Sequence, residues 1–535
     1  MLALNKNAPD SEEMPRNWRF WCIILSLAIC MLLTAIEFTA VGTALPVIVQ
    51  SLNGDEFVWV GSAYTLGSTA LIPFCGGLAQ IFGRRIVILA AVGLFCLGSV
   101  LCGVATSMNF LIGGRTVQGL GAGAITALIQ IIIADLVPLK ERGSFNGIMA
   151  LAWGIGGGSG PVIGGSLAER GQWRWLFYLN LPIGGLAITV VTLFLRLKVP
   201  NEPLHEKWRR MDWIGNLIIV LSTTSVVIAL TWAGIQFPWS SAKVLVPLIL
   251  GLLGLAGFVL YEALVSEHPI VPISILGSRT AFSGYAQNFF NGVVIAALSY
   301  WLPVYFQACK SAGPTAAGVD GFGLSYTISP SSMLAGIIVQ KTGRYRQPMW
   351  VGWTLMIVGS ALLATLDENS SRSMCYGFQA LIGVGMGIIY VTAYFPVLAP
   401  IPVSQSAPAL AFFTFIRNFA LIWGVTIGGT VLQNQLTTRL PPTFLAEFPG
   451  GTQIAFEVIP SIRDLPQPLK DEVRHAFAIS LQVLWNVLAG ISGLGLLFSL
   501  VMEHLPLHTS VDSHWGRDDA PNTQKVGSHS ESIAP

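Results

Sequence analysis

The stretch GGLAQIFGRR (76–85) recurs in altered form 260 residues later, as GIIVQKTGRY (336–345). The coinciding positions are Gly76/Gly336, Gln80/Gln340, Gly83/Gly343 and Arg84/Arg344. A second echo pairs GLGAG (119–123) with GVGMG (383–387) at an offset of 264 residues. Because each copy of the first motif closes an apolar run, the chain is predicted to contain two related halves. Repeated halves are typical of transporters, although a repeat by itself indicates fold more than function.

The composition indicates an integral membrane protein. Of the 535 residues, 53% are hydrophobic and only 10% are charged, whereas soluble domains carry about 25% charged residues. The mean hydropathy is +0.66. The net charge of +2 and the lack of a Lys/Arg run argue against nucleic-acid binding. The first apolar run, 20–46, is too long for a signal peptide and predicts a spanning helix.

Hydropathy predicts an all-α protein with fourteen spans, since a span needs about 20 mostly apolar residues. The expected spans are 20–45, 57–79, 86–106, 109–137, 145–167, 174–196, 212–232, 243–265, 281–306, 318–340, 348–366, 375–398, 406–431 and 476–501. Together with the repeat, they predict a first six-helix bundle (20–196), a linker with two inserted helices (197–280) and a second six-helix bundle (281–502). The tails 1–19 and 503–535 are expected to be cytoplasmic, the second of them disordered. Residues 432–475 are expected to form a long extracellular loop.

Basic residues predict the orientation, because Lys and Arg gather in short cytoplasmic loops. With a cytoplasmic N-terminus, thirteen of them fall in inner loops: Arg84, Arg85, Lys140, Arg142, Arg196, Lys198, Lys207, Arg209, Arg210, Arg279, Lys341, Arg344 and Arg346. Five fall in short outer loops: Arg170, Arg174, Lys243, Lys310 and Arg372. This excess places both termini in the cytoplasm. The sequon Asn369-Ser370-Ser371 then faces outward, as glycosylation requires.

Few ionisable residues lie inside the predicted spans, where each is expensive and therefore a functional candidate. Glu37 lies in the first span and Arg115 in the fourth, both away from helix ends. A carboxyl group in a dry cavity can exchange protons near neutral pH, while a guanidinium stays charged. Arg417 is a further candidate, with the competing role of clamping helices together. Three more acids, Asp135, Asp212 and Glu262, lie near helix ends, where interfacial anchoring competes with function.

Other chemistry finds no support in the sequence. There is no GxxxxGK[ST] motif for ATP, no HExxH and no metal spacing among the seven histidines. We therefore expect no cofactor, no metal and no enzymatic activity. GIGGGSG (154–160) mimics a dinucleotide loop but lies inside an apolar span. Five of the seven cysteines lie in apolar runs, and a bridge between the other two, Cys309 and Cys375, is left open.

The stretch GGGSGPVIGG (156–165) predicts a helix with one bare face. Gly156, Gly160 and Gly164 recur every four residues along one side, where another helix can approach closely. Pro161 removes one backbone donor and should bend this helix. The stretch indicates either a functional seam or a purely structural kink.

Five motifs in the right order make the chain resemble the major facilitator superfamily, and within it the fourteen-span drug:proton antiporters found in fungi. The resemblance covers nearly the whole chain between the tails. GGLAQIFGRR resembles the loop motif GxLaDrxGrr, and LIGGRTVQGLGAG, with Arg115 and Gln118, resembles RxxqGxG. The antiporter motif GxxxGPxxGG is matched by Gly156, Gly160, Pro161, Gly164 and Gly165. Span 1, with Ile36-Glu37, Thr39 and Ala44-Leu45-Pro46, resembles LDxTxxxxALP, and residues 173–184 resemble WRWxFxxNxPxG.

Two positions depart from the family pattern. Gln80 stands where the loop motif usually has an acid that braces helices by charge pairing. Glu37 stands where the family more often has Asp, which keeps the carboxyl and lengthens its reach. The resemblance implies gating and packing roles for the loop motif, including Gly76, Gly83, Arg84 and Arg85, and for the span 5 motif.

The resemblance also implies alternating access and export driven by proton entry. Glu37 would be protonated from outside, and Arg115 would bias its protonation. The expected partners are protons, the lipid bilayer and a small, lipophilic substrate such as a toxin or secondary metabolite, with export across the plasma membrane conferring multidrug resistance. The alternatives are a vacuolar transporter of basic amino acids or siderophores, and a non-transporting membrane sensor.

Overall fold

The computed structural model describes residues 17–52, 58–195, 205, 209, 211–234, 236–447 and 459–507. Most of the two predicted tails, nearly all of the charged linker after residue 195 and the middle of the predicted loop 432–475 lie outside the described residues.

The described chain is helical throughout and contains no strand. The first half contains α1 (Trp18–Leu52), α2 (Val58–Phe82), α3 (Arg84–Gly103), α4 (Met108–Leu136), α5 (Leu139–Glu169), α6 (Arg174–Tyr178) and α7 (Asn180–Phe194). Two further helices follow, α9 (Trp213–Trp232) and α10 (Ala242–Leu264). The second half contains η1 (Ile273–Ile275), α11 (Arg279–Lys310), α12 (Pro314–Asp320), α13 (Phe322–Thr342), α14 (Arg346–Leu363), α15 (Arg372–Thr392), α16 (Phe395–Leu398), η2 (Val403–Gln405), α17 (Ser406–Arg439), α18 (Pro442–Glu447), α20 (Ile459–Ile462) and α21 (Leu469–Val501).

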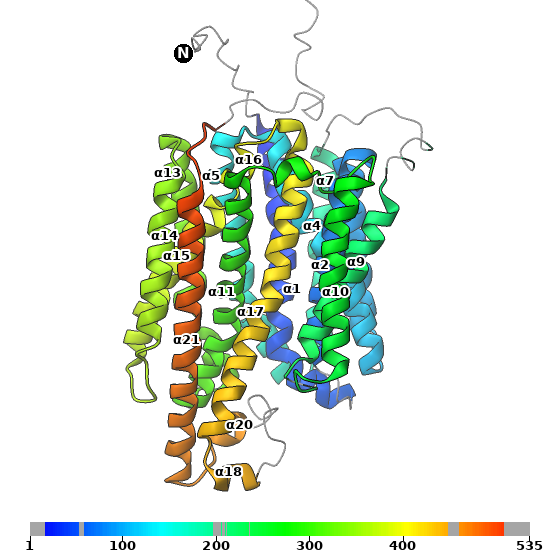
Figure 1. The fold of residues 1–535 in the computed structure, drawn as a ribbon. Helices are drawn as coiled ribbons and strands as arrows, with labels where there is room; N and C mark the ends of the chain where they lie inside the picture. Colours follow the sequence, from blue (N-terminus) through cyan, green and yellow to red (C-terminus); the bar gives the residue numbers. More distant parts are fainter. Residues whose placement is uncertain are drawn as a thin grey trace, which may run out of the picture.

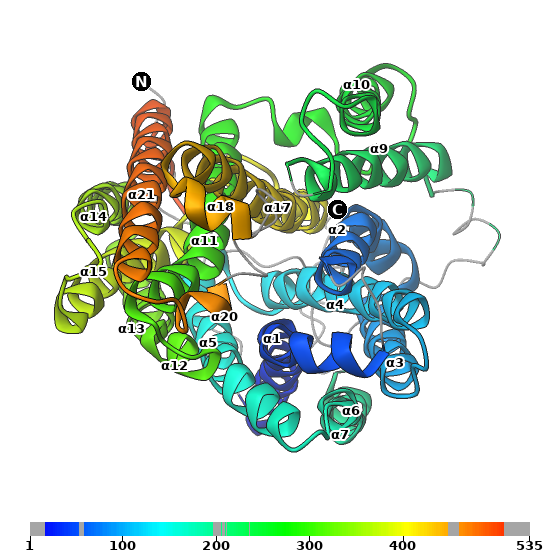
Figure 2. The same ribbon diagram turned by 90° about the horizontal axis from the view of Figure 1, so that it is seen from below.

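The long helices run side by side and form two groups, α1–α7 and α11–α21 (Figures 1 and 2). We call the end at which α1 begins the proximal end, which is at the top of Figure 1, and the opposite end the distal end. The two groups meet along two seams, where α5 packs against α13 and α2 packs against α17. Backbone groups inside a bilayer have no other partner than their own helix, which explains this uniform choice of structure.

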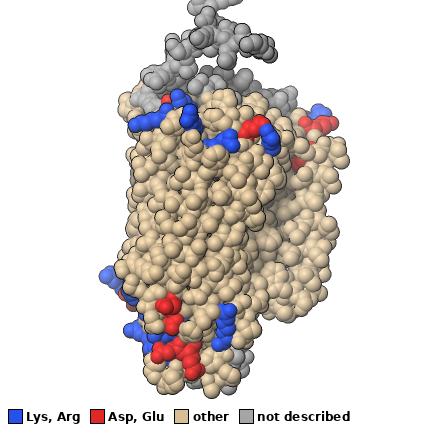
Figure 3. Space-filling view, turned by 60° about the vertical axis from the view of Figure 1, so that its left-hand side comes forward, with Lys and Arg blue, Asp and Glu red and all other residues tan. Residues whose placement is uncertain are grey.

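Twelve helices of the described residues are long and apolar enough to cross a membrane. Figure 3 shows the charged side chains of one face gathered toward the two ends, with a broad uncharged band between them. The chain is therefore a multi-pass membrane protein. Two helices of the expected fourteen spans, α5 and α14, fall outside the twelve, although α5 packs between α1 and α13, and α14 between α15 and α21. The count of fourteen stays a prediction.

The pair α9 and α10 lies beside the seam between α2 and α17 (Figure 2). On the α2 side, the rings of Phe74 and Trp213 are 5.8 Å apart. On the α17 side, the Thr426 hydroxyl donates to the Leu230 carbonyl at 3.3 Å. The helix α9 therefore contacts both groups at once.

The glycines of α5 bring α1 very close. A Cβ added at Gly156 would lie 2.8 Å from the Ala35 Cβ, and one at Gly164 would lie 2.2 Å from the Ala40 carbonyl oxygen. The bare face predicted from the glycine spacing is thus in contact with α1. Further glycines on α5 face α13, since a Cβ at Gly147 would lie 2.6 Å from the Met333 Cα. The helix continues through Pro161 to Glu169.

Both copies of the repeated motif contain a glycine with a positive φ at the same position, although the ψ angles differ, at 147° for Gly83 and 6° for Gly343. Gly83 has φ +88° where α2 passes into α3, and Gly343 has φ +66° at the end of α13. Side chains with a Cβ rarely adopt this left-handed region, which explains glycine at both positions.

Three details extend or settle the sequence expectations. The helix α17 continues to Arg439, and α21 already begins at Leu469, so both reach into the predicted loop 432–475. All seven cysteines are free, so Cys309 and Cys375 form no bridge.

Because α1 approaches α5 so closely, adding one methyl group between them should lower the stability of the protein. Changing Gly164→Ala places a Cβ against the backbone oxygen of Ala40 and should destabilise the protein by about 1–3 kcal/mol. Gly77→Ala is the matched control, because nothing lies within 4 Å of its added Cβ. Thermal unfolding in detergent, followed by a thiol-reactive dye that detects the buried cysteines, measures both. Equal unfolding temperatures for the two variants would contradict the packing.

Candidate functional site

Glu37 on α1 and Arg115 on α4 form a salt bridge inside the first helix group, from Arg115 Nη1 to Glu37 Oε1. Both side chains are almost completely buried, with exposed fractions of 0% and 2%. The sequence singled out each residue separately as a charge inside a span, and the structure brings them together. Unpaired, either charge would be very costly there.

Neutral polar groups complete the surroundings of the pair. Asn180 Nδ2 donates to the second carboxylate oxygen of Glu37 at 2.6 Å. Arg115 donates to Gln118 Oε1 at 2.6 Å and to the Val60 carbonyl at 3.1 Å. Both amides also reach the hydroxyl of Ser99 on α3, at 2.8 Å from Gln118 and 3.3 Å from Asn180. The network therefore joins α1, α2, α3, α4 and α7.

An aromatic side chain covers the guanidinium. The carbon Cζ of Arg115 lies 4.3 Å from the centre of the Tyr64 ring, which favours a cation. The Tyr64 ring in turn lies 6.3 Å from that of Phe38, whose side chain is 44% exposed. Because Glu37 itself is fully buried, a proton can reach it only after neighbouring side chains move.

Arg417 occupies a different site, in the second helix group. Its Nε donates to Asn288 Oδ1 at 2.9 Å, and its Nη2 donates to the Tyr390 carbonyl at 2.9 Å. The guanidinium also stacks on the rings of Tyr390 and Phe413, at 3.9 and 4.8 Å. It forms no ion pair among the described residues and is not part of the Glu37 network. These contacts match the clamping role, since they join α11, α15 and α17.

The loop motif lies at the proximal end. Arg84 is buried and pairs with Asp135 on α4, with Nε 2.8 Å from Oδ2, while Arg85 donates to the Thr192 carbonyl at 2.6 Å. Asp135 is therefore buried in an ion pair with Arg84 and is not an exposed anchor at the membrane interface, which was the competing role considered for it. Gly76 faces α17, where an added Cβ would lie 3.0 Å from the Ala411 Cβ. Gln80 lines a cavity beside that contact.

Gly165, the last position of the span 5 motif, and the sequon at Asn369 both lie away from the Glu37–Arg115 ion pair. At Gly165 an added Cβ would lie 3.5 Å from Thr315 Oγ1, which is an ordinary contact distance. Asn369 is exposed, in the turn between α14 and α15 at the distal end (Figure 1). Its backbone N–H donates to Asp367 Oδ1 at 2.9 Å. A hydrogen bond from the Ser370 hydroxyl holds the pKa of Asp367 below its usual value.

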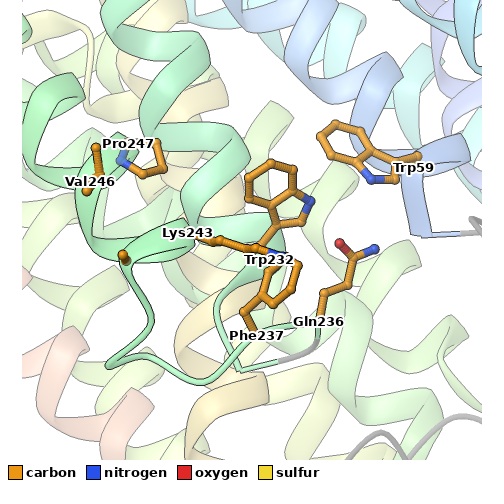
Figure 4. Close-up of a pocket in the computed structure, with 8 residues that line it drawn as sticks. Trp59, Trp232, Gln236, Phe237, Lys243, Val246 and Pro247 are labelled. Carbon is orange, nitrogen blue, oxygen red and sulfur yellow. The ribbon is translucent and has the colours of Figure 1, made fainter.

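A cavity of about 700 Å³ lies at the distal end, between α2, α9 and α10. Figure 4 shows the rings of Trp232 and Phe237 close together, with Trp59 nearby. The ring centres of Trp59 and Trp232 are 6.1 Å apart, and the ammonium of Lys243 lies 4.3 Å from that of Phe237. This mixture is typical of an aromatic belt at a membrane interface, so we do not assign the cavity to the transport pathway.

Sequence reasoning did not identify three polar residues of the network as site residues: Asn180, Gln118 and Ser99. Uncharged polar side chains are common inside spans, so hydropathy gives no signal for them. Two of the three stood in the family motifs, where Asn180 belongs to WRWxFxxNxPxG and Gln118 to RxxqGxG. The motifs could therefore have supplied them.

Comparison with known proteins agrees with a helical membrane transporter. The family model of the Major Facilitator Superfamily matches residues 27–425. The chain is 36% identical over 531 residues to "Efflux pump FUS6" of Gibberella moniliformis, covering 97% of this chain and 94% of the relative. It is 34% identical over 521 residues to the "Acurin A biosynthesis cluster MFS-type transporter" of Aspergillus aculeatus, covering 95% and 94%.

A solved structure shares the fold. The proton:xylose symporter XylE, bound to 6-bromo-6-deoxy-D-glucose, superimposes with a TM-score of 0.59 at 15% identity, covering 92% of this chain and 98% of that one. The chain belongs to the major facilitator superfamily. It is therefore a membrane transporter by family.

Removing one member of the Glu37–Arg115 ion pair should destabilise the protein more than removing both. Arg115→Met leaves the buried Glu37 carboxylate without its cation and should destabilise the protein by about 3–5 kcal/mol. The double change Glu37→Gln with Arg115→Met removes both charges and should recover much of that loss. Thermal unfolding of the two purified variants measures the difference. A double variant no more stable than Arg115→Met would show that the charges are not coupled.

Proposed function

We propose that this protein is a proton-coupled exporter of toxic or secondary-metabolite small molecules, working by antiport and alternating access. The observation that carries the proposal is the buried carboxyl of Glu37, held by Arg115 and Asn180 inside one helix group. A carboxyl in such a place can take up and release a proton as its surroundings change. The names of the two relatives, an efflux pump and a transporter of a biosynthesis cluster, support the direction and the kind of cargo.

The network suggests how protonation would act. A proton on Glu37 removes the charge that Arg115 pairs with, while Arg115 keeps neutral acceptors on Gln118 and Val60 and the ring of Tyr64. The cation is then still solvated by the protein, but α1 is no longer held to α4 by charge. In this hypothesis the protonated state loosens α1 and lets the substrate leave on the outer side. Deprotonation toward the cytoplasm restores the pair.

In this proposal the two helix groups move against each other at the α5–α13 and α2–α17 seams. At the proximal end, an added Cβ at Gly336 would lie 2.3 Å from the Gly143 carbonyl oxygen, and Ser144 and Gln340 form a hydrogen bond across the α5–α13 seam. Such close contacts between the groups favour a state closed at the proximal end. We assign that end to the cytoplasm from the excess of basic residues in the inner loops, and we place the protein in the plasma membrane. The bundle boundaries 20–196 and 281–502 are the proposed rigid units.

Two alternatives to this proposal are a vacuolar transporter and a non-transporting sensor. A vacuolar importer of basic amino acids, or a siderophore exchanger, would use the same fold, and substrate accumulation inside the vacuole would distinguish it from export into the medium. A non-transporting sensor would show no movement of substrate at all. Deleting the gene and measuring both toxin sensitivity and metabolite retention separates the three.

The carboxyl of Glu37 can be tested without altering its size. Glu37→Gln should abolish proton-coupled export, because an amide takes up no proton in this pH range. The measurement uses proteoliposomes with a trapped pH-sensitive dye and a compound to which the wild-type protein confers resistance in cells. Substrate addition should move protons with the wild-type protein and not with the variant.

Two controls make that result specific. Glu37→Asp keeps the carboxyl and should retain part of the coupled transport. Thermal unfolding confirms that Glu37→Gln is folded. Unchanged proton movement in a folded Glu37→Gln protein would remove Glu37 from the mechanism.

The proposed orientation predicts a sugar at Asn369. Its exposed turn lies at the distal end, opposite the start of α1, so a cytoplasmic N-terminus places it outside. Expression in a eukaryotic cell should give a band that moves faster after glycosidase treatment. Asn369→Gln should remove the shift while leaving the protein folded. A wild-type protein modified elsewhere, or unmodified with its N-terminus mapped outside, would contradict the assignment.

A further inference from the structure

A second cavity, of about 430 Å³, lies at the proximal end and outside the Glu37 network. We call it the proximal cavity. Its wall includes Phe74 and Gln80 of α2, Asp212 and Asn216 at the start of α9, and Glu267 and Ile270 after α10. Pro408 near the start of α17 closes the other side. The volume is within the range of small-molecule sites, roughly 300–1,000 Å³.

The repeat explains why space remains here. At the α5–α13 seam, Gln340 is bonded to Ser144 and the backbones touch at Gly143 and Gly336. At the α2–α17 seam, the corresponding Gln80 faces the cavity, and Pro408 brings neither an amide donor nor a hydroxyl toward it. At this seam the inserted helix α9 and the segment after α10 enclose the cavity together with α2 and α17.

The cavity wall contains two acids, Asp212 and Glu267, and one imidazole, that of His268. Asp212 accepts hydrogen bonds from the Gly215 amide and the Tyr261 and Ser266 hydroxyls, all of which are neutral groups. Glu267 is exposed at the rim. Neither acid forms a salt bridge within the described parts of the chain. The helix ends nearby, two N-terminal (α9, α17) and two C-terminal (α2, α10), offset one another, so the carboxylates decide the sign.

A buried acceptor without a donor strengthens this point. Asn216 is 8% exposed, and its Nδ2 donates to the Asp212 carbonyl at 2.6 Å, but its Oδ1 has no hydrogen-bond partner. Buried acceptors normally have a donor, and the Asn216 oxygen belongs to a residue of the cavity wall, where a ligand could supply one.

The geometry points to a binding site for an amphipathic organic cation in the proximal cavity. Asp212, Glu267 and the Asn216 oxygen would hold an ammonium or phosphonium centre, while Phe74, Ile81 and Ile270 would cover its apolar part. A metal ion fits less well, because the described residues contain no group of three His, Cys, Asp or Glu side chains that could hold one. The site does not depend on Glu37 and goes beyond the proposed proton coupling.

Occupancy would also bias the conformation. The cavity wall comes from α2 in the first group, α17 in the second and the inserted α9. A ligand that touches all three binds only while the α2–α17 seam is closed at this end. It therefore favours that state by the free energy of its binding.

The test measures binding of tetraphenylphosphonium to the full-length protein by equilibrium dialysis in detergent. Tetraphenylborate, of the same shape and opposite charge, is the matched ligand control. We expect saturable binding of the cation and no comparable binding of the anion. Equal affinity for the two ions would overturn the proposal.

Variants then locate the site. Asp212→Asn with Glu267→Gln should raise the Kd for the cation about tenfold or more, since two charges are lost. Asn216→Leu, which fills the cavity and removes the free acceptor, should also weaken binding. Glu169→Gln, which removes an exposed acid at the distal end, should leave the Kd unchanged, and Glu37→Gln should not raise it.

The exposed position of Glu267 keeps the test independent of folding. Glu267→Gln alone should weaken binding several-fold in a protein that unfolds at the wild-type temperature. An unchanged Kd in folded Glu267→Gln and Asn216→Leu proteins would overturn the site. A Kd raised by Glu37→Gln instead would place the cation in the central pathway and would also overturn it.

Discussion

The first helix group is organised around one interaction, the buried salt bridge between Glu37 and Arg115. Two unpaired charges at this depth would cost several kcal/mol each, and pairing repays that cost only when the remaining donors and acceptors are also satisfied. Asn180, Gln118 and Ser99 meet that condition from three different helices. The pair therefore constrains the rotation and depth of α1, α3, α4 and α7 together, and any change in its charge must be felt by all of them.

The glycines of α5 make this placement of Glu37 attainable. Because α1 lies almost backbone to backbone against Gly156, Gly160 and Gly164, the opposite side of α1 can reach α4 and α7. The same α5 also presents glycines to α13, so one helix sets both the position of α1 and the distance between the two groups. A movement between the groups therefore acts on the helix that carries the carboxyl.

The sequence predicted the fold well, because apolar runs, repeated motifs and glycine spacing are all local signals. It also singled out Glu37 and Arg115, since a charge within an apolar run is conspicuous. The family resemblance implied that Arg115 biases the protonation of Glu37, but neither their direct salt bridge nor the roles of Asn180 and Ser99 were predicted, because these depend on how distant helices rotate toward each other. The ends of α17 and α21 were also missed, since a helix that leaves the hydrocarbon region can continue with polar residues. The proximal cavity gave no signal, because it is formed by residues of four segments far apart in sequence.

The two halves share a fold but differ in charge, and this difference bears on the mechanism. At the repeat offset, the position of Arg115 corresponds to Gln379, which is buried and neutral, and Arg84, paired with Asp135, corresponds to the exposed Arg344. Arg417 is held by Asn288 and aromatic rings with no acid nearby in the described structure. Among the described residues, the two ion pairs in which both partners are buried, Glu37–Arg115 and Arg84–Asp135, thus lie in the first group. If a proton drives the cycle, it acts on that group, and the second group responds through the α5–α13 and α2–α17 seams. The inserted α9 lies against only one of these seams, which makes the two unequal in an otherwise repeated molecule.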